Sequence, residues 1–235
     1  MTERQIELRD NYFRVLEKIE AAKERRGGGE VRLLAATKTV PAEDIRFLVE
    51  NFGLKLCGEN HAQEFVAKYD EVRAAGAEMD FIGHLQTNKV KYLAGRARMI
   101  HSLDSLKLAA EIERQCNKLG VKQEVLVEIN IGSEESKSGI APCAVEDFLG
   151  ELEAFPSIIV SGMMTMAPKC EEKSEFRKYF RESYQIFIDF FAKKTHNIRE
   201  AVLSMGMSDS FECAIEEGAT LVRVGSSIFG SRIYP

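Results

Sequence analysis

The chain has 235 residues, of which 45% are hydrophobic and 29% charged, the composition of a folded globular protein. Its formal net charge of −5 argues against the broad basic surface that nucleic acids or anionic membranes require. The N-terminus has no signal-peptide core and no apolar run is long enough to cross a bilayer, so we expect a cytoplasmic protein. Five scattered cysteines without a C-x-x-C pair predict free thiols and no metal site.

The chain opens with a charged amphipathic segment that ends in the glycine-rich run Arg25–Gly29 and predicts an extra helix within residues 1–29. From Val31 onward, short strand-like runs alternate with longer segments of helical period, as in repeated βα units. The predicted strands are Val31–Thr37, Leu54–Cys57, Asp80–Gly83, Arg98–His101, Glu124–Ile129, Ile158–Met164, Ala201–Ser204 and Thr220–Val224. The predicted helices are Ala42–Asn51, Ala62–Ala75, Asn88–Leu93, Ser105–Leu119, Ala144–Ala154, Lys173–Lys194 and Ser210–Glu217, with a short turn after Ser226.

Eight strands, each followed by a helix, predict a closed (β/α)8 barrel, a TIM barrel, over residues 31–230 of one domain that spans the chain. Its active face lies where strands end and helices begin. A doubly wound open sheet is the alternative, and it would place the site at a switch point of the sheet.

Two Gly/Ser turns near the C-terminus follow the last two predicted strands and favour a bound phosphate. Backbone N–H groups at Gly206 and Gly225 and hydroxyls of the neighbouring serines would form a cup, beside the permanent cation of Arg223. The serines of this cup are Ser204, Ser208, Ser226 and Ser227. Barrels of this kind often bind phosphate with the loops after strands seven and eight.

A simpler interpretation of the first turn is also open. Asp209 is followed three residues later by Glu212, which is typical of a helix start, so Ser208 and Asp209 could cap the next helix. Capping and phosphate binding are compatible, because both organise the same N–H groups.

Lys38 lies at the C-terminal end of the first predicted strand, at the barrel mouth. A lysine there often only extends into water. Strand one closes onto strand eight in a barrel, however, so Lys38 and the turn after Arg223 should be neighbours. An amine beside a phosphate cup is what a Schiff base to a phosphorylated aldehyde requires.

The chain resembles the pyridoxal phosphate homeostasis family, single-domain relatives of the alanine racemase barrel, nearly from end to end. The resemblance rests on Ala36-Thr-Lys-Thr39, Gly58-Glu-Asn60 with Gln63-Glu64, Phe81-Ile-Gly-His-Leu-Gln86 with Asn88-Lys89, Gly162-Met-Met-Thr165, Leu203-Ser-Met-Gly-Met-Ser-Asp209, and Arg223-Val-Gly225 with Ile228-Phe-Gly230.

The resemblance implies that Lys38 holds pyridoxal 5′-phosphate (PLP) covalently as an internal aldimine. It implies that Ser208, Gly225 and Ser226 hold the phosphate and that Arg223 faces the pyridine nitrogen. An arginine there donates to an unprotonated nitrogen, which makes the cofactor a weak electron sink. Asn60, after strand two, would bond the phenolic oxygen, with an ordinary turn asparagine as the alternative. His84 is left outside the expected site, because a structural role is as plausible.

The resemblance also implies a monomer that controls the level of PLP and its amino-acid partners, with transient contact to PLP-dependent apo-enzymes and no robust turnover. Only Ser231–Pro235 follow Gly230, so we expect no second domain to supply the second acid/base of a racemase. We therefore assign no catalytic residue. A PLP-dependent racemase or decarboxylase is the first alternative, and a Schiff-base aldolase that uses Lys38 on a sugar phosphate is the second.

Overall fold

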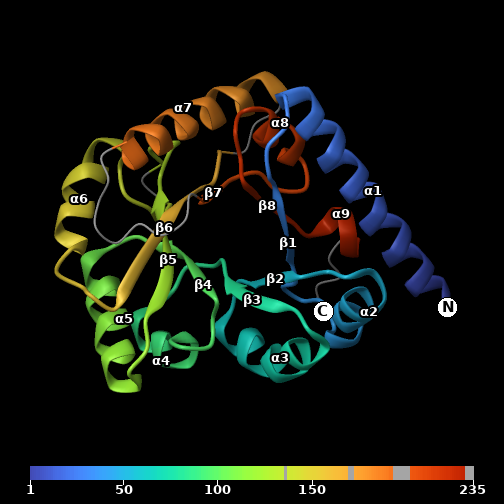
Figure 1. Cartoon of the computed structure of the whole chain (residues 1–235), viewed down its shortest axis with the longest axis horizontal. Helices are drawn as coiled ribbons and strands as arrows, with labels where there is room; N and C mark the ends of the chain where they lie inside the picture. The colour runs from blue at the N-terminus through green and yellow to red at the C-terminus, as the bar shows by residue number, and fades with distance from the viewer. Residues whose placement is uncertain (135–136, 169–171, 193–201, 231–235) are drawn as a thin grey trace.

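Eight parallel strands close into a barrel in this computed structural model, which describes residues 1–134, 137–168, 172–192 and 202–230 (Figure 1). The strands follow chain order around the barrel, and the last pairs with the first. They are β1 (Arg32–Ala36), β2 (Leu56–Glu59), β3 (Glu78–Phe81), β4 (Met99–Leu103), β5 (Gln123–Ile129), β6 (Ile158–Thr165), β7 (Val202–Ser204) and β8 (Leu221–Val224). The predicted barrel is confirmed, and the open sheet is wrong.

Helices form the outer wall of the barrel (Figure 1). They are α1 (Glu3–Arg26), α2 (Ala42–Phe52), α3 (Ala62–Ala75), α4 (Val90–Leu93), α5 (Leu106–Leu119), α6 (Val145–Leu152), α7 (Lys173–Ala192), α8 (Phe211–Glu216) and α9 (Ser226–Phe229), with 3₁₀ turns at Thr87–Lys89 and Pro142–Ala144. Among the described helices, none combines the length and apolar character that crossing a bilayer requires.

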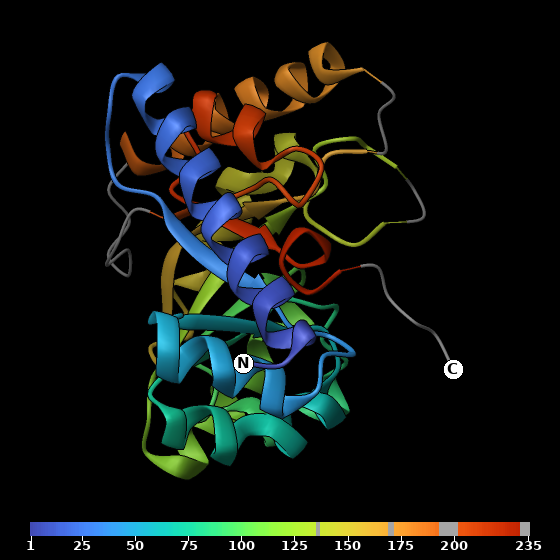
Figure 2. The same ribbon diagram turned by 90° about the vertical axis from the view of Figure 1, so that its right-hand side faces the viewer.

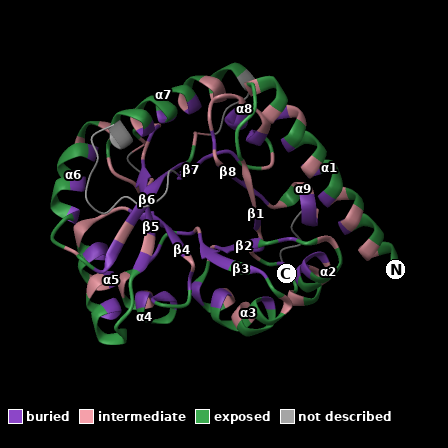
Figure 3. Ribbon diagram, in the orientation of Figure 1, coloured by how far each residue is buried: buried purple, intermediate pink, exposed green. Residues whose placement is uncertain are grey.

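The strands are buried along most of their length, whereas the helices expose their outer sides (Figure 3). Inside the barrel, seven strands contribute to one small apolar cluster: Leu34, Leu56, Met99, Leu126, Met164, Val202 and Leu221. A larger apolar cluster, which includes Phe65 and Phe180, fills the space between strands and helices. Strand side chains alternate between these two layers because successive residues of a strand point to opposite faces.

The N-terminal helix α1 packs across the outside of the barrel against α8 and α9 (Figure 2). A capping box between Thr2 and Gln5 starts it, and Gly27 ends it in the left-handed conformation at φ 89°. Two side chains of α1 tie it to the C-terminal turn: Arg4 Nη2 donates to Phe229 O at 2.9 Å, and Asn11 donates to Ile228 O at 3.1 Å.

The third predicted strand, Asp80–Gly83, is shifted by two residues to Glu78–Phe81, and the second begins at Leu56 rather than Leu54. Gly53 ends α2 in the left-handed conformation at φ 73°, and the Leu54 amide still donates to the Leu48 carbonyl. This C-terminal cap uses the residues that the apolar pattern assigns to the strand. The predicted strand start at Ala201 and helix end at Lys194 lie outside the described residues.

Candidate functional site

The turn after β8 and the loop after β7 meet through Ser208. Its hydroxyl accepts hydrogen bonds from the backbone N–H of Gly225 at 3.2 Å and of Ser227 at 3.3 Å. Helix α8 begins instead after Ser210, whose hydroxyl accepts from the Met207 N–H. The capping interpretation of Ser208 is therefore wrong. This hydroxyl lies among N–H donors of the second turn, so the two predicted turns form one polar surface.

Gly206 allows the loop after β7 to lie flat against α8 and β8. It adopts φ 91°, and a Cβ at this position would lie 2.5 Å from Cβ of Ala214. Its carbonyl accepts a hydrogen bond from the Arg223 N–H at 3.1 Å. A larger residue would therefore push away the loop that carries Ser208.

Lys38 and the second turn line one cavity of about 430 Å³. Lys38 is half-buried just beyond β1, and Gly225, Ser226 and Phe229 also line the cavity. Pairing of Ala35 with Val224 brings the two strand ends together. A Cβ on Gly225 would lie 3.1 Å from the Ala36 carbonyl oxygen. The prediction that the end of strand one lies beside the second turn is confirmed.

Arg223 is buried inside the barrel. Nη1 donates to Ser204 Oγ at 2.6 Å and Nη2 donates to the Thr165 carbonyl at 3.1 Å. Burial lowers the pKa of Arg223 to about 10, while the nearby Glu128 opposes the decrease. The guanidinium therefore stays charged at neutral pH. Ser204 on β7 and Thr165 on β6 hold this cation in one position.

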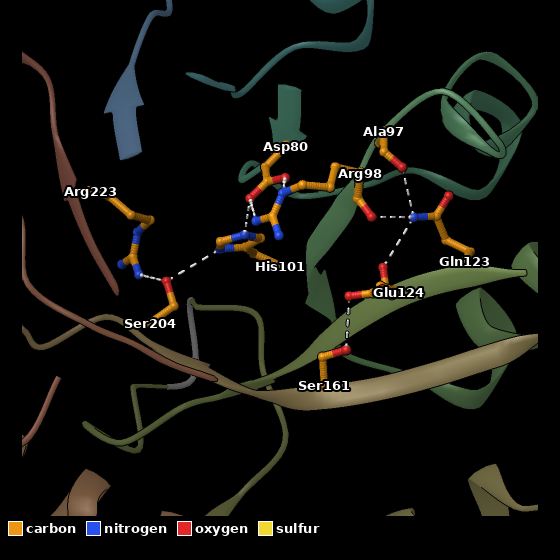
Figure 4. A network of polar contacts seen from close by, with 9 residues as sticks. All are labelled: Asp80, Ala97, Arg98, His101, Gln123, Glu124, Ser161, Ser204 and Arg223. Carbon is orange, nitrogen blue, oxygen red and sulfur yellow. Dashed lines mark hydrogen bonds and ion pairs between the residues drawn. The ribbon is translucent and has the colours of Figure 1, made fainter. Parts of the chain in front are cut away.

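Ser204 lies in a chain of polar side chains that crosses the barrel interior (Figure 4). His101 Nδ1 lies 3.2 Å from Ser204 Oγ, and His101 Nε2 lies 2.9 Å from Asp80 Oδ2. Asp80 also accepts two hydrogen bonds from Arg98, at 2.8 and 2.5 Å. Since β4 and β7 are not neighbours in the barrel, the contact between His101 and Ser204 spans its interior.

The proton positions in this chain follow from the partners. Asp80 can only accept, so the hydrogen of His101 lies on Nε2. Burial lowers the pKa of His101, and the charges of Arg223 and Arg98 lower it further against the opposing effect of Asp80. The neutral ring leaves Nδ1 as an acceptor for the Ser204 hydroxyl hydrogen. Ser204 Oγ then accepts from Arg223, and every hydrogen bond in the chain points toward Asp80.

Asp80, His101 and the buried carboxyl group of Glu128, near the end of β5, were not predicted as site residues from the sequence. Glu128 is 6% exposed, and its pKa is raised to about 7 by burial and the nearby charge of Asp104, against the opposing charge of Arg223. Glu128, Asp80 and His101 all occupy predicted strands of a parallel sheet. Such strands are ordinarily apolar on both faces, so polar residues within a predicted strand are the sequence feature that could have indicated these buried groups.

Asn60 lines a second cavity of about 330 Å³, at the ends of β2 and β3, with His84, Gln86 and Lys89. His84 is exposed there, and its Nδ1 lies 3.0 Å from Ser138 Oγ. The structure thus brings Lys38, Gly225 and Ser226 into one cavity, with Ser208 bonded to its wall. Ser204 and Arg223 belong to the interior chain. The cofactor roles of all seven residues stay predictions.

Comparison with known proteins assigns the chain to a family. Residues 11–233 match the family described as alanine racemase, N-terminal domain. The chain is 46% identical over 227 residues to the pyridoxal phosphate homeostasis protein of Aquifex aeolicus, with 96% of this chain and 98% of the relative covered. The chain belongs to the pyridoxal phosphate homeostasis protein family.

Solved structures agree with this assignment. PipY of Synechococcus elongatus, a structure with PLP bound, superposes with a TM-score of 0.77 and 29% identity over 85% of this chain and 92% of PipY. An alanine racemase of Clostridium difficile superposes with a TM-score of 0.70 at 19% identity, over 96% of this chain and 56% of the racemase, which shows the common fold alone. The homeostasis family and the racemases thus share one barrel architecture.

Proposed function

We propose that this protein binds PLP at the mouth of the barrel and serves in the control of intracellular PLP. The observation that carries the proposal is that Lys38 and the turn at Gly225–Ser226 line one cavity. The names of relatives such as the Aquifex protein, and PLP in the PipY structure, support it.

The residues of the cavity fit the chemistry of this cofactor. The N–H groups of Gly225 and Ser227 converge on the hydroxyl oxygen of Ser208, and a phosphate oxygen would take the place of this acceptor. The half-buried Lys38 supplies the amine. When bound, the cofactor would supply an aldehyde, and Lys38 is the residue that would hold it covalently through its amine.

The other predicted ligands have supporting roles in this proposal. Arg223 presents N–H donors only, so toward a pyridine nitrogen it favours the unprotonated form. Ser204 fixes the guanidinium through its 2.6 Å hydrogen bond. Asn60, which lines the second cavity at the ends of β2 and β3, would bond the phenolic oxygen of the ring.

The attachment of PLP to Lys38 can be tested directly. Purified protein with added PLP should show a visible absorption band, and borohydride should fix one pyridoxyl group on the peptide that contains Lys38, identified by mass spectrometry. Lys38→Ala should lose both signals. Lys107→Ala, which removes an exposed lysine of α5, should keep them. A pyridoxyl group distributed over surface lysines would contradict the proposal.

The proposal also includes a cytoplasmic monomer that meets PLP-dependent apo-enzymes transiently, for which the family resemblance is the support. Gel filtration with light scattering tests the monomer. Transfer of PLP from the loaded protein to an apo-enzyme, measured as recovered enzyme activity against free PLP at the same concentration, tests the contact.

A further inference from the structure

Charged side chains of α3 hold the backbone on both sides of Lys38. Lys68 Nζ donates to the Thr37 carbonyl at 2.9 Å, and Glu64 Oε2 accepts from the Thr39 N–H at 2.7 Å. These two groups belong to the peptide units that flank Lys38. We propose that Glu64 and Lys68, together with Glu59, are positioning residues that fix Lys38 at the barrel mouth for cofactor attachment. We call these three residues the Lys38 clamp, and the proposal rests on the proposed function.

The clamp is centred on the ammonium group of Lys68, whose three donors are all used. An ammonium group has three donors, and Lys68 Nζ has three acceptors: Thr37 O at 2.9 Å, Glu59 Oε1 at 2.8 Å and Glu64 Oε2 at 3.1 Å. Glu59 is fully buried at the end of β2, and its Oε1 also accepts from the Thr37 hydroxyl at 2.7 Å. The ammonium of Lys68 uses all its donors, whereas Oε2 of Glu59 has no hydrogen-bond partner among the described residues. Short bonds to this largely buried ammonium restrain the backbone more tightly than an exposed ion pair does.

The turn that carries Lys38 needs such restraint. Thr39 adopts φ 63°, the left-handed region that is uncommon for a residue other than glycine. The carboxylate of Glu64 accepts from the N–H of this residue, and Val40 N–H closes the turn onto Thr37 O at 3.0 Å. The clamp therefore stabilises an unfavourable backbone conformation next to the residue that bears the reactive amine.

The clamp lies outside the barrel wall, away from the cavity itself. Lys68 and Glu64 are on α3, and neither lines the cavity that contains Lys38. They act on Lys38 only through the Thr37 and Thr39 peptide groups. This separation makes the proposal distinct from one in which these residues bind the cofactor.

The first test uses protein without cofactor. Amide hydrogen exchange at Thr39 should be tenfold or more faster in Glu64→Ala than in the wild type. Glu64→Gln keeps a side-chain oxygen acceptor and should restore most of the protection. Glu71→Ala is the matched control, because Glu71 lies on the same helix and pairs with Arg46 of α2 at 2.8 Å. Equal Thr39 exchange in Glu64→Ala and wild type would overturn the proposal.

The second test adds PLP. Glu64→Ala should form the borohydride-reducible product at Lys38 at least fivefold more slowly, Glu64→Gln should recover most of the rate, and Glu71→Ala should match wild type. Faster Thr39 exchange without a slower attachment would also overturn the proposal. A wild-type protein that forms no product at Lys38 would instead contradict the proposed function. The exchange measurement tests the clamp independently of that result, because it uses protein without cofactor.

Removal of Lys68 needs a paired variant, because Lys68→Met leaves Glu59 buried without its cationic partner. The double variant Glu59→Gln with Lys68→Met removes both charges at once. It should resemble Glu64→Ala, with faster exchange at Thr39 and slower attachment of PLP. A folded double variant with wild-type behaviour in both measurements would refute the role of Lys68.

Discussion

Arg223 on β8 donates a 2.6 Å hydrogen bond to the hydroxyl of Ser204 on β7, inside the barrel. The same hydroxyl lies 3.2 Å from His101, which is held by Asp80 on the opposite wall. The orientation of the buried cation thus depends on residues from four strands. Burying a charged group is costly unless its hydrogen bonds are complete, so this chain stabilises both the core and the position of Arg223.

Ser204→Ala should lower the free energy of unfolding by about 2 kcal/mol, because it leaves an N–H of Arg223 and Nδ1 of His101 without this partner. Urea unfolding followed by circular dichroism measures the loss. Ser102→Ala is the control, since the Ser102 hydroxyl is equally buried and has no hydrogen-bond partner among the described residues. It should change stability by roughly 0.5 kcal/mol or less. Equal losses in both variants would show that the chain contributes little.

The sequence could predict the barrel and the place of Lys38, because both depend on local patterns. Alternation of strands and helices gives the strand order once the barrel closes, and closure places the end of strand one beside the turn at Gly225. These inferences need no knowledge of side-chain direction.

The interior chain and the Lys38 clamp could not be predicted, because they depend on side-chain direction across elements far apart in sequence. A serine at the end of a short strand can point into the barrel or toward the loop cluster, and a boundary error of one residue reverses the choice. The structure turns Ser204 inward to Arg223. The contact between Lys68 and Thr37 likewise joins residues 31 positions apart.

Ser208→Ala and Ser226→Ala should each weaken PLP binding by roughly 1 kcal/mol or more, about fivefold to tenfold, because each removes a hydroxyl that can bond to a charged phosphate. Ser174→Ala, which removes an exposed hydroxyl of α7, should leave the affinity unchanged. Equilibrium dialysis with PLP measures the dissociation constants. If Ser208→Ala and Ser226→Ala bind PLP as tightly as Ser174→Ala does, the phosphate does not bind at these two serines.

Glu128→Gln should change how stability depends on pH. The pKa of Glu128 is raised from 4.5 to about 7 by burial, so the folded protein holds this proton more tightly than the unfolded chain does. The stabilisation is therefore full below about pH 4 and is lost as the pH rises toward about 7. At about 1.4 kcal/mol per pKa unit, the loss is roughly 3 kcal/mol.

The measurement is the difference in unfolding free energy between wild type and Glu128→Gln at several pH values from 4 to 8. His101 and other titrating groups are common to both proteins, so their contributions largely cancel. The wild type should lose stability relative to the variant as pH rises. Parallel curves would show that Glu128 titrates normally in the folded protein.

The PLP-loaded protein should not sustain interconversion of L- and D-alanine. Racemisation by two bases needs a proton-transfer group on each face of the substrate, and Lys38 can serve only one. Among the described residues that line its cavity, Asp44 has the one carboxylate, and Arg4 holds it at 3.0 Å. Chiral chromatography with added PLP should give a rate close to that of Lys38→Ala and of PLP alone. Steady turnover of about 1 s⁻¹ or more that disappears in Lys38→Ala would establish a racemase.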